Sequence, residues 1–188
     1  MRSRVEAPEE LVATVADRTE PALVLLTGTR GTGKSRWCER LAGVGRAAGL
    51  DVAGLVSPAV VESGVKTAID LLDLGSGARR RLADRPPPGL PGTAGLGWRF
   101  HPETLAWGNE VLGRTGPCDL LVLDELGPLE LRDESGFAAS FPALAARRYR
   151  LAVVVVRPEL LGEAHRRWPR IAEVLELHAR EADEEGGG

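Results

Sequence analysis

The chain has 188 residues, 43% of them hydrophobic, which is enough to bury the core of one domain, and we expect that domain to span residues 1–180. Its 24 basic and 27 acidic side chains give a formal net charge of −3, so nothing in the charge balance predicts a nucleic-acid or anionic-membrane partner. The first residues are charged instead of apolar, and no apolar run approaches the ~20 residues of a membrane span. We therefore expect a cytoplasmic protein, and by default a monomer.

Apolar runs alternate along the chain with segments of helical spacing, which predicts an α/β fold with a mostly parallel sheet flanked by helices and a small hairpin insertion. The expected strands are 22–27, 51–57, 65–74 with its hairpin return 79–83, 119–125, 151–156 and 174–177. The expected helices are 8–18, 35–48, 102–114, 135–147 and 159–166.

Two segments are predicted to lack regular structure. The stretch 86–95 is rich in Pro and Gly and predicts an exposed, mobile loop, with an ordered substrate lid as the alternative. The acidic, Gly-rich tail 181–188 is expected to be disordered.

A phosphate-binding loop of the Walker A pattern G-x-x-x-x-G-K-[ST] lies between the first expected strand and the helix after it. It consists of Gly28, Thr29, Arg30, Gly31, Thr32, Gly33, Lys34 and Ser35. In such a loop the backbone N–H groups and the helix N-terminus bind phosphate, the lysine reaches the β- and γ-phosphates, and the serine hydroxyl ligates Mg²⁺. The sequence therefore predicts a nucleoside triphosphate site with Lys34 and Ser35 in these roles.

A second apolar strand ends in two adjacent carboxylates, Asp124 and Glu125, as a Walker B strand does. We expect Asp124 to lie in the Mg²⁺ shell and Glu125 to orient the attacking water as a general base. The alternative is that both carboxylates merely end a strand in solvent.

Residues 124–131, Asp-Glu-Leu-Gly-Pro-Leu-Glu-Leu, resemble the D-E-[IL]-G-x-[ML]-E-L signature of the small nucleoside-triphosphatases first described in thermophiles, also called cancer-related nucleoside-triphosphatases. The resemblance spans residues 22–156 and includes the segments 54–57 and 64–72. It implies a RecA-like P-loop fold and Mg²⁺-dependent hydrolysis of ATP, GTP and other nucleoside triphosphates. By position, the functional residues it implies are Lys34, Ser35, Asp124 and Glu125.

The chain also departs from the family pattern. Ala59 and Val61 stand where the family usually has a Glu and an Arg, and the Asn-Arg pair that many members have after the last strand is absent from the sequence. These departures concern the base pocket and the arginine contact to the γ-phosphate, and they leave the phosphate loop intact.

Several other charged residues are candidates for the site. Arg30 either points to solvent or touches the γ-phosphate or a neighbouring subunit, and Arg157 is either a phosphate sensor or a solvated strand end. The run 79–81 is expected to be a solvated hairpin face. Glu130 is either catalytic, a cap of the following helix, or a partner of Arg132.

The aromatic residues allow both core and base-stacking roles. We expect Trp37 in the core, Trp98 and Phe100 at the cleft, and consider Trp168 as a contact to the base. All but two of the basic residues are arginines, as in GC-rich genomes; the two lysines are Lys34 and Lys66.

Three functions are compatible with the sequence. The leading hypothesis is a nucleoside-triphosphatase. The alternatives on the same fold are a small-molecule or nucleoside kinase, and a nucleotide-switched binding module in a cofactor or transport pathway.

Overall fold

The computed structural model describes residues 2–4, 7–87, 89–90, 92 and 97–178. Its strands are β1 (Arg2–Arg4), β2 (Ala22–Thr27), β3 (Val52–Val56), β4 (Ala59–Glu62), β5 (Val65–Asp73), β6 (Arg79–Asp84), β7 (Arg99–Phe100), β8 (Cys118–Leu123), β9 (Tyr149–Val155) and β10 (Glu173–Glu176). Its helices are α1 (Pro8–Ala13), α2 (Lys34–Ala47), α3 (Pro102–Gly113), α4 (Pro128–Leu131), α5 (Ser140–Ala145), the 3₁₀ turn η2 (Pro158–Leu160) and α6 (Leu161–Arg167).

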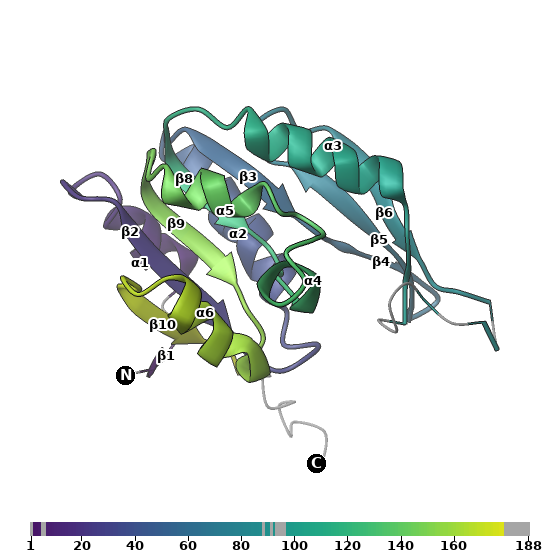
Figure 1. Ribbon diagram of the computed structural model, residues 1–188. Helices are drawn as coiled ribbons and strands as arrows, with labels where there is room; N and C mark the ends of the chain where they lie inside the picture. The colour runs from purple at the N-terminus through teal and green to yellow at the C-terminus, as the bar shows by residue number, and fades with distance from the viewer. Residues whose placement is uncertain (1, 5–6, 88, 91, 93–96, 179–188) are drawn as a thin grey trace, which may run out of the picture.

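All ten strands form one sheet in the order β1-β10-β2-β9-β8-β3-β5-β6-β7, with β4 paired to β5 (Figure 1). The pairs from β1 to β3 are parallel, and the pairs beyond β3 are antiparallel. Strands β2 and β3 are consecutive in this parallel half, yet β9 and β8 lie between them. In open α/β sheets, ligands bind at the carboxyl edge where the strand order reverses in this way.

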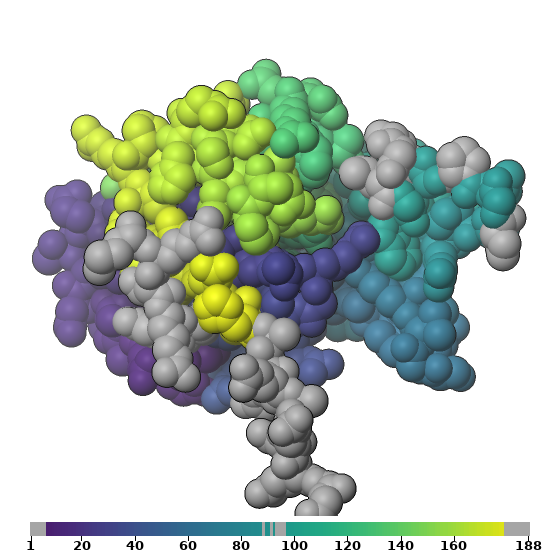
Figure 2. Space-filling view, turned by 90° about the horizontal axis from the view of Figure 1, so that it is seen from below, coloured from purple at the N-terminus to yellow at the C-terminus, as the bar shows by residue number. Residues whose placement is uncertain are grey.

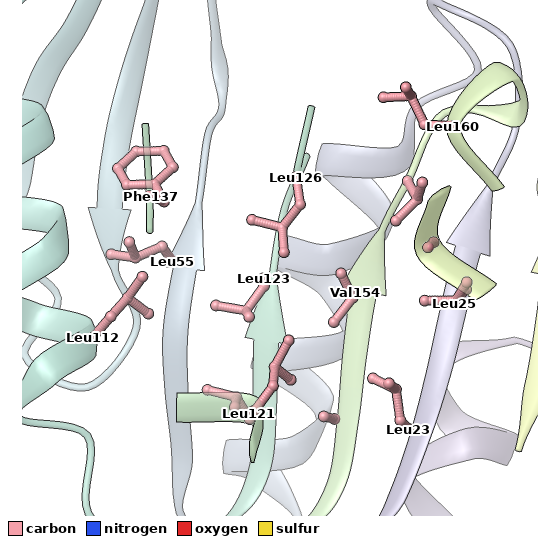
Figure 3. Packing of buried hydrophobic residues seen from close by; sticks show 14 of the residues in the cluster. Leu23, Leu25, Leu55, Leu112, Leu121, Leu123, Leu126, Phe137, Val154 and Leu160 are labelled. Carbon is pink, nitrogen blue, oxygen red and sulfur yellow. The ribbon is translucent and has the colours of Figure 1, made fainter. Parts of the chain in front are cut away.

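The central strands are covered on both faces, which explains their long apolar runs such as residues 23–26 and 151–155. Successive side chains of a strand point to opposite faces, so Val153 and Val154 of β9 belong to different cores. One core contains α1 and α2 with Val153. The other packs α3, α5 and α6 over Val154, Leu121 and Leu123, and Figure 3 shows this packing.

The antiparallel half is larger than the hairpin expected from the sequence. Strands β4 to β7 extend the sheet beyond β3, and α3 packs across β3, β5 and β6 (Figure 1). The expected return of the chain at 79–83 is confirmed as β6, but β4 and β7 were not predicted. Strand β4 is mostly exposed and β7 has only two residues, so neither has the buried apolar run of the parallel strands.

The α/β class and the order of the main elements are confirmed, while the helix expected at 135–147 is wrong at its start. The helix α5 begins at Ser140. Gly136 before it has φ 62°, which is not helical, and the N–H of Phe137 donates to the Glu130 side chain instead of continuing a helix. The leading helix expected at 8–18 is likewise shorter and ends at Ala13.

Parts of two predicted irregular segments lie outside the described residues. These are the tail 181–188 and, within the expected loop 86–95, positions 88, 91 and 93–95. Across the part of the chain that the structure describes, every helix is too short or too polar to cross a membrane.

Gly54 of β3 is required by the close approach of β8. Its φ is 117°, and a Cβ added there would lie 1.9 Å from the carbonyl oxygen of Val122. We predict that Gly54→Ala lowers the free energy of unfolding by about 3 kcal/mol, because the substitution combines backbone strain with a collision against a neighbouring strand. Urea unfolding followed by circular dichroism measures this.

The matched control is Gly43→Ala in α2, where a Cβ meets no atom within 4 Å. Because Gly43 is helical and exposed, this change should raise stability by up to about 1 kcal/mol. Equal effects of the two substitutions would contradict the assignment of Gly54.

Candidate functional site

The phosphate loop connects the end of β2 to the first turn of α2. Gly31 and Gly33 have φ of 85° and 89°, a conformation that other residues adopt only with strain. Gly28 is fixed for a different reason: a Cβ there would lie 2.3 Å from the carbonyl oxygen of Leu177, next to β10. The glycines of the motif therefore allow the backbone to form the loop that the Walker A pattern predicted.

Lys34 is the first residue of α2 and bends back over the loop. Its Nζ donates hydrogen bonds to the carbonyl oxygens of Gly28 and Thr29, each 2.8 Å away. Partial burial lowers the pKa of Lys34, and the nearby carboxylates of Glu125 and Asp124 oppose that shift. The ammonium is thus held over the loop and close to the acidic end of β8.

Asp124 lies directly after β8, and its side chain is buried at 4% relative exposure. One oxygen accepts a hydrogen bond from the backbone N–H of Ser57 at 3.0 Å, and the Ser35 hydroxyl also bonds to this carboxylate. Burial raises the pKa of Asp124 to about 6, an effect that these hydrogen bonds partly offset. A cation beside the carboxylate would favour its charged form.

The oxygens of Ser35 and Asp124 fit the ligand preference of Mg²⁺. This ion takes oxygen ligands and keeps several waters, so it needs only one or two protein groups beside substrate phosphates. Among the described residues, no group of three or more His, Cys, Asp or Glu side chains is placed to hold a metal ion.

Glu125 is held by Arg157, which follows β9. The Nε of Arg157 donates to Oε1 of Glu125 at 2.7 Å, and an Nη of the same guanidinium donates to the same oxygen. Glu125 has φ 62°, a left-handed conformation that is uncommon outside glycine and often found at functional sites. The sequence left Arg157 open as a sensor or a solvated strand end, and the structure places it in contact with Glu125.

A cavity of about 740 Å³ opens in front of the loop. One wall contains Lys34, Ser35, Asp124, Glu125 and Arg157. The rest of the lining comes from the segment after β3, the antiparallel extension and the segments packed on it; it contains Ser57, Pro58, Ala59, Val61, Lys66, Ile69, Leu82, Arg85, Trp98, Phe100, Leu105 and Phe137. Figure 2 views the molecule from the edge where the parallel strands end: the dark-blue start of α2 lies between the yellow-green C-terminal elements and the teal extension.

The structure brings together most of the predicted site residues. Of the phosphate loop, the residues at the cavity are Arg30, Gly31, Gly33, Lys34 and Ser35, while Gly28, Thr29 and Thr32 form its frame. Trp98 and Phe100 line the cavity, as expected. Trp37 is buried in the core, as expected.

Other candidates lie elsewhere. Trp168 packs against Phe141 with 6.0 Å between ring centroids. Arg79 and Arg81 of β6 form ion pairs with Asp70 on the neighbouring strand, so this run is held on the sheet surface.

Glu130 has a structural position. Its two carboxylate oxygens accept hydrogen bonds from the backbone N–H groups of Gly127 and Phe137, each at 2.8 Å. Burial raises the pKa of Glu130, and these two bonds act in the opposite direction. Glu130 therefore caps its own helix α4, whose N-cap residue is Gly127, and the expected cap of the following helix is wrong because α5 begins only at Ser140. Arg132, the other suggested partner, pairs with Glu163.

Sequence reasoning missed two features of the cavity. Ser57, which holds Asp124 through its backbone N–H, has no side-chain pattern that reveals this role. Lys66 lines the cavity opposite the loop, and the rarity of lysine in this chain was an available indication.

We predict that Glu130→Ala lowers the free energy of unfolding by about 2 to 6 kcal/mol, because it leaves two buried N–H groups without a partner and each costs about 1 to 3 kcal/mol. Glu134→Ala is the control, since Glu134 is 69% exposed and its ion pair with Arg167 is at the surface. Urea unfolding of both variants decides the matter; equal stabilities would exclude the capping role.

Several known proteins are similar to this chain in fold or in sequence. The chain shares its fold with a human cancer-related nucleoside triphosphatase whose structure was determined in solution, with a TM-score of 0.60 and 24% identity over 82% of this chain and 88% of that one. It is 30% identical over 116 residues to the nucleoside-triphosphatase THEP1 of Methanopyrus kandleri, covering 61% of this chain and 63% of that protein. The THEP1 protein of Caldivirga maquilingensis is 25% identical over 134 residues, covering 70% and 74%.

The chain thus spans less than two thirds of the length of the Methanopyrus protein. A family model described as NTPase matches residues 23–181, a range that includes the loop, the Asp124–Glu125 pair and Arg157. The chain therefore belongs to the NTPase family.

Proposed function

We propose that this protein hydrolyses nucleoside triphosphates to nucleoside diphosphate and phosphate with the help of Mg²⁺. The observation that carries the proposal is the meeting, at one cavity, of the phosphate-loop Lys34, the buried Asp124 and the strained, arginine-bound Glu125. A cation, a candidate metal ligand and a candidate base on one edge of the sheet are the parts that phosphoryl transfer to water needs.

The loop binds the phosphates through its N–H groups and the N-terminus of α2. Lys34 exchanges the carbonyl oxygens of Gly28 and Thr29 for phosphate oxygens, so its ammonium is already positioned before the nucleotide arrives. Ser35 and Asp124 would hold Mg²⁺, which when bound neutralises charge on the β- and γ-phosphates.

Glu125 orients the attacking water. The water oxygen forms a bond to the γ-phosphorus, the bond from that phosphorus to the β–γ bridging oxygen breaks, and a water proton passes to the Glu125 carboxylate. Because Arg157 donates to Oε1 of Glu125, it fixes this carboxylate next to the γ-phosphate and brings a positive charge to the same place.

A second candidate function is phosphoryl transfer to a small molecule. One feature of the cavity favours it: beyond the catalytic groups the lining includes the apolar side chains of Ile69, Leu82, Phe100 and Phe137, and a single attacking water does not require them. Release of one phosphate per triphosphate consumed, with no acceptor added, separates hydrolysis from transfer.

The first test is Glu125→Gln, which removes the base and keeps the side-chain size. We expect kcat for phosphate release from ATP, GTP, CTP and UTP to fall by about 10²- to 10⁴-fold while nucleotide binding persists. Glu110→Gln, an exposed position on α3, is the control and should leave turnover unchanged. Normal hydrolysis by Glu125→Gln would remove Glu125 from the mechanism.

Asp124→Asn tests the metal role. Loss of a carboxylate ligand should raise the Mg²⁺ concentration for half-maximal activity by at least about tenfold, since loss of even an outer-shell partner costs about 10- to 100-fold in metal affinity. The control is Asp119→Asn at the opposite end of the same strand, where the carboxylate pairs with Arg150. A magnesium titration identical to that of the unmodified protein would take Asp124 out of the metal shell.

A further inference from the structure

Lysine is nearly absent from this chain, and both lysines line the same cavity. All but two of the 24 basic residues are arginines, and the exceptions are Lys34 and Lys66. Lys34 belongs to the phosphate loop, while Lys66 is the second residue of β5 in the antiparallel extension. A compositional bias that replaces lysine elsewhere has left it at two positions that line one cavity.

The ammonium of Lys66 lies beside an aromatic ring and has no carboxylate partner among the described residues. Its Nζ lies 4.9 Å from the centroid of the Trp98 ring, which also lines the cavity. Partial burial lowers the pKa of Lys66, and the nearby carboxylates of Glu125 and Asp124 oppose that shift. Within the described ranges, no carboxylate forms a hydrogen bond or an ion pair with this ammonium.

The strand order indicates which part of a nucleotide Lys66 faces. The loop follows β2, Asp124 and Glu125 follow β8, and β5 lies two strands beyond β8 on the side away from β2. A triphosphate bound in the loop directs its γ-phosphate toward the metal aspartate and the water-orienting glutamate. A triphosphate bound in the loop would therefore direct its γ-phosphate toward the side of the cavity on which β5 and Lys66 lie.

We propose that Lys66 is a second catalytic lysine, whose Nζ contacts the γ-phosphate and stabilises the charge on its oxygens during transfer. The inference rests on the proposed function and adds to it a residue on the antiparallel extension. Because the contact requires the third phosphate, Lys66 distinguishes triphosphates from diphosphates, whereas Lys34 and the loop bind both.

Trp98 is the positioning residue for Lys66. The ring lies beside the ammonium and limits the directions in which the flexible lysine stem extends. Lysine suits this place because its ammonium is compact and its donors rotate, whereas the guanidinium of arginine is planar and broader. This difference accounts for a lysine in a chain that otherwise uses arginine.

The test compares binding of AMP-PNP and of ADP, each with Mg²⁺, by isothermal titration calorimetry, together with kcat for ATP hydrolysis. In Lys66→Met, which keeps the stem beside Trp98, we expect AMP-PNP affinity to fall by about 10- to 100-fold with ADP affinity unchanged. We expect kcat to fall by about 100-fold, as for loss of one donor to a developing charge. Lys66→Arg should recover part of both.

Arg99→Ala is the matched control. Arg99 is exposed and lies between Trp98 and Phe100, but unlike these two it is not among the described residues that line the cavity. It removes one positive charge from the same segment and should change neither the affinity ratio nor kcat.

The inference would be overturned if Lys66→Met left the ratio of AMP-PNP to ADP affinity unchanged, whether both affinities stayed the same or both fell by the same factor. Lys34→Ala separates this failure from failure of the proposed function. If Lys34→Ala abolishes hydrolysis and Lys66→Met behaves like Arg99→Ala, only the role of Lys66 is wrong. If Lys34→Ala hydrolyses ATP normally, the proposed function is wrong as well.

Discussion

The parallel pairing of β9 between β2 and β8 is the constraint on which the rest of the molecule depends. Residues 22–26 pair with 151–155, and 120–123 pair with 151–154, in continuous registers. Because parallel strands end at the same edge, this pairing places the phosphate loop, Arg157 and the Asp124–Glu125 pair side by side. The Arg157–Glu125 contact therefore follows from strand register, between residues that are 32 positions apart in the chain.

How much of the fold was predictable depends on how each element is buried. The central strands are covered on both faces, so their apolar runs identified them from sequence, and α2 was identified by the glycine loop before it. Strands β4 and β7 lack such runs, because they are exposed or very short. The start of α5 is set by Gly136 and by the hydrogen bond from Phe137 to Glu130, a tertiary contact that no local pattern reveals.

The same distinction applies to the candidate site: residues in local motifs were predictable from sequence, and contacts that depend on strand order were not. The roles expected of Lys34, Ser35, Asp124 and Glu125 came from motifs whose spacing reflects local backbone geometry, and all four residues lie at one cavity. Their chemical roles, like the monomeric state, stay predictions. The pairing of Arg157 with Glu125 and the position of Lys66 depend on strand order, which the sequence did not fix.

The sheet divides the interior into two cores, and this division affects which substitutions in the interior the protein tolerates. Leu41 and Val153 lie in the layer beneath the phosphate loop, while Leu112 and Val154 lie in the layer that supports the cavity wall. Substitutions far from the sheet on its two sides, such as at Leu41 and at Leu112, are separated by the backbone of the sheet, and the effects of such distant substitutions on stability usually add. The cavity side can therefore be repacked for a new ligand shape while the packing under the phosphate loop is kept.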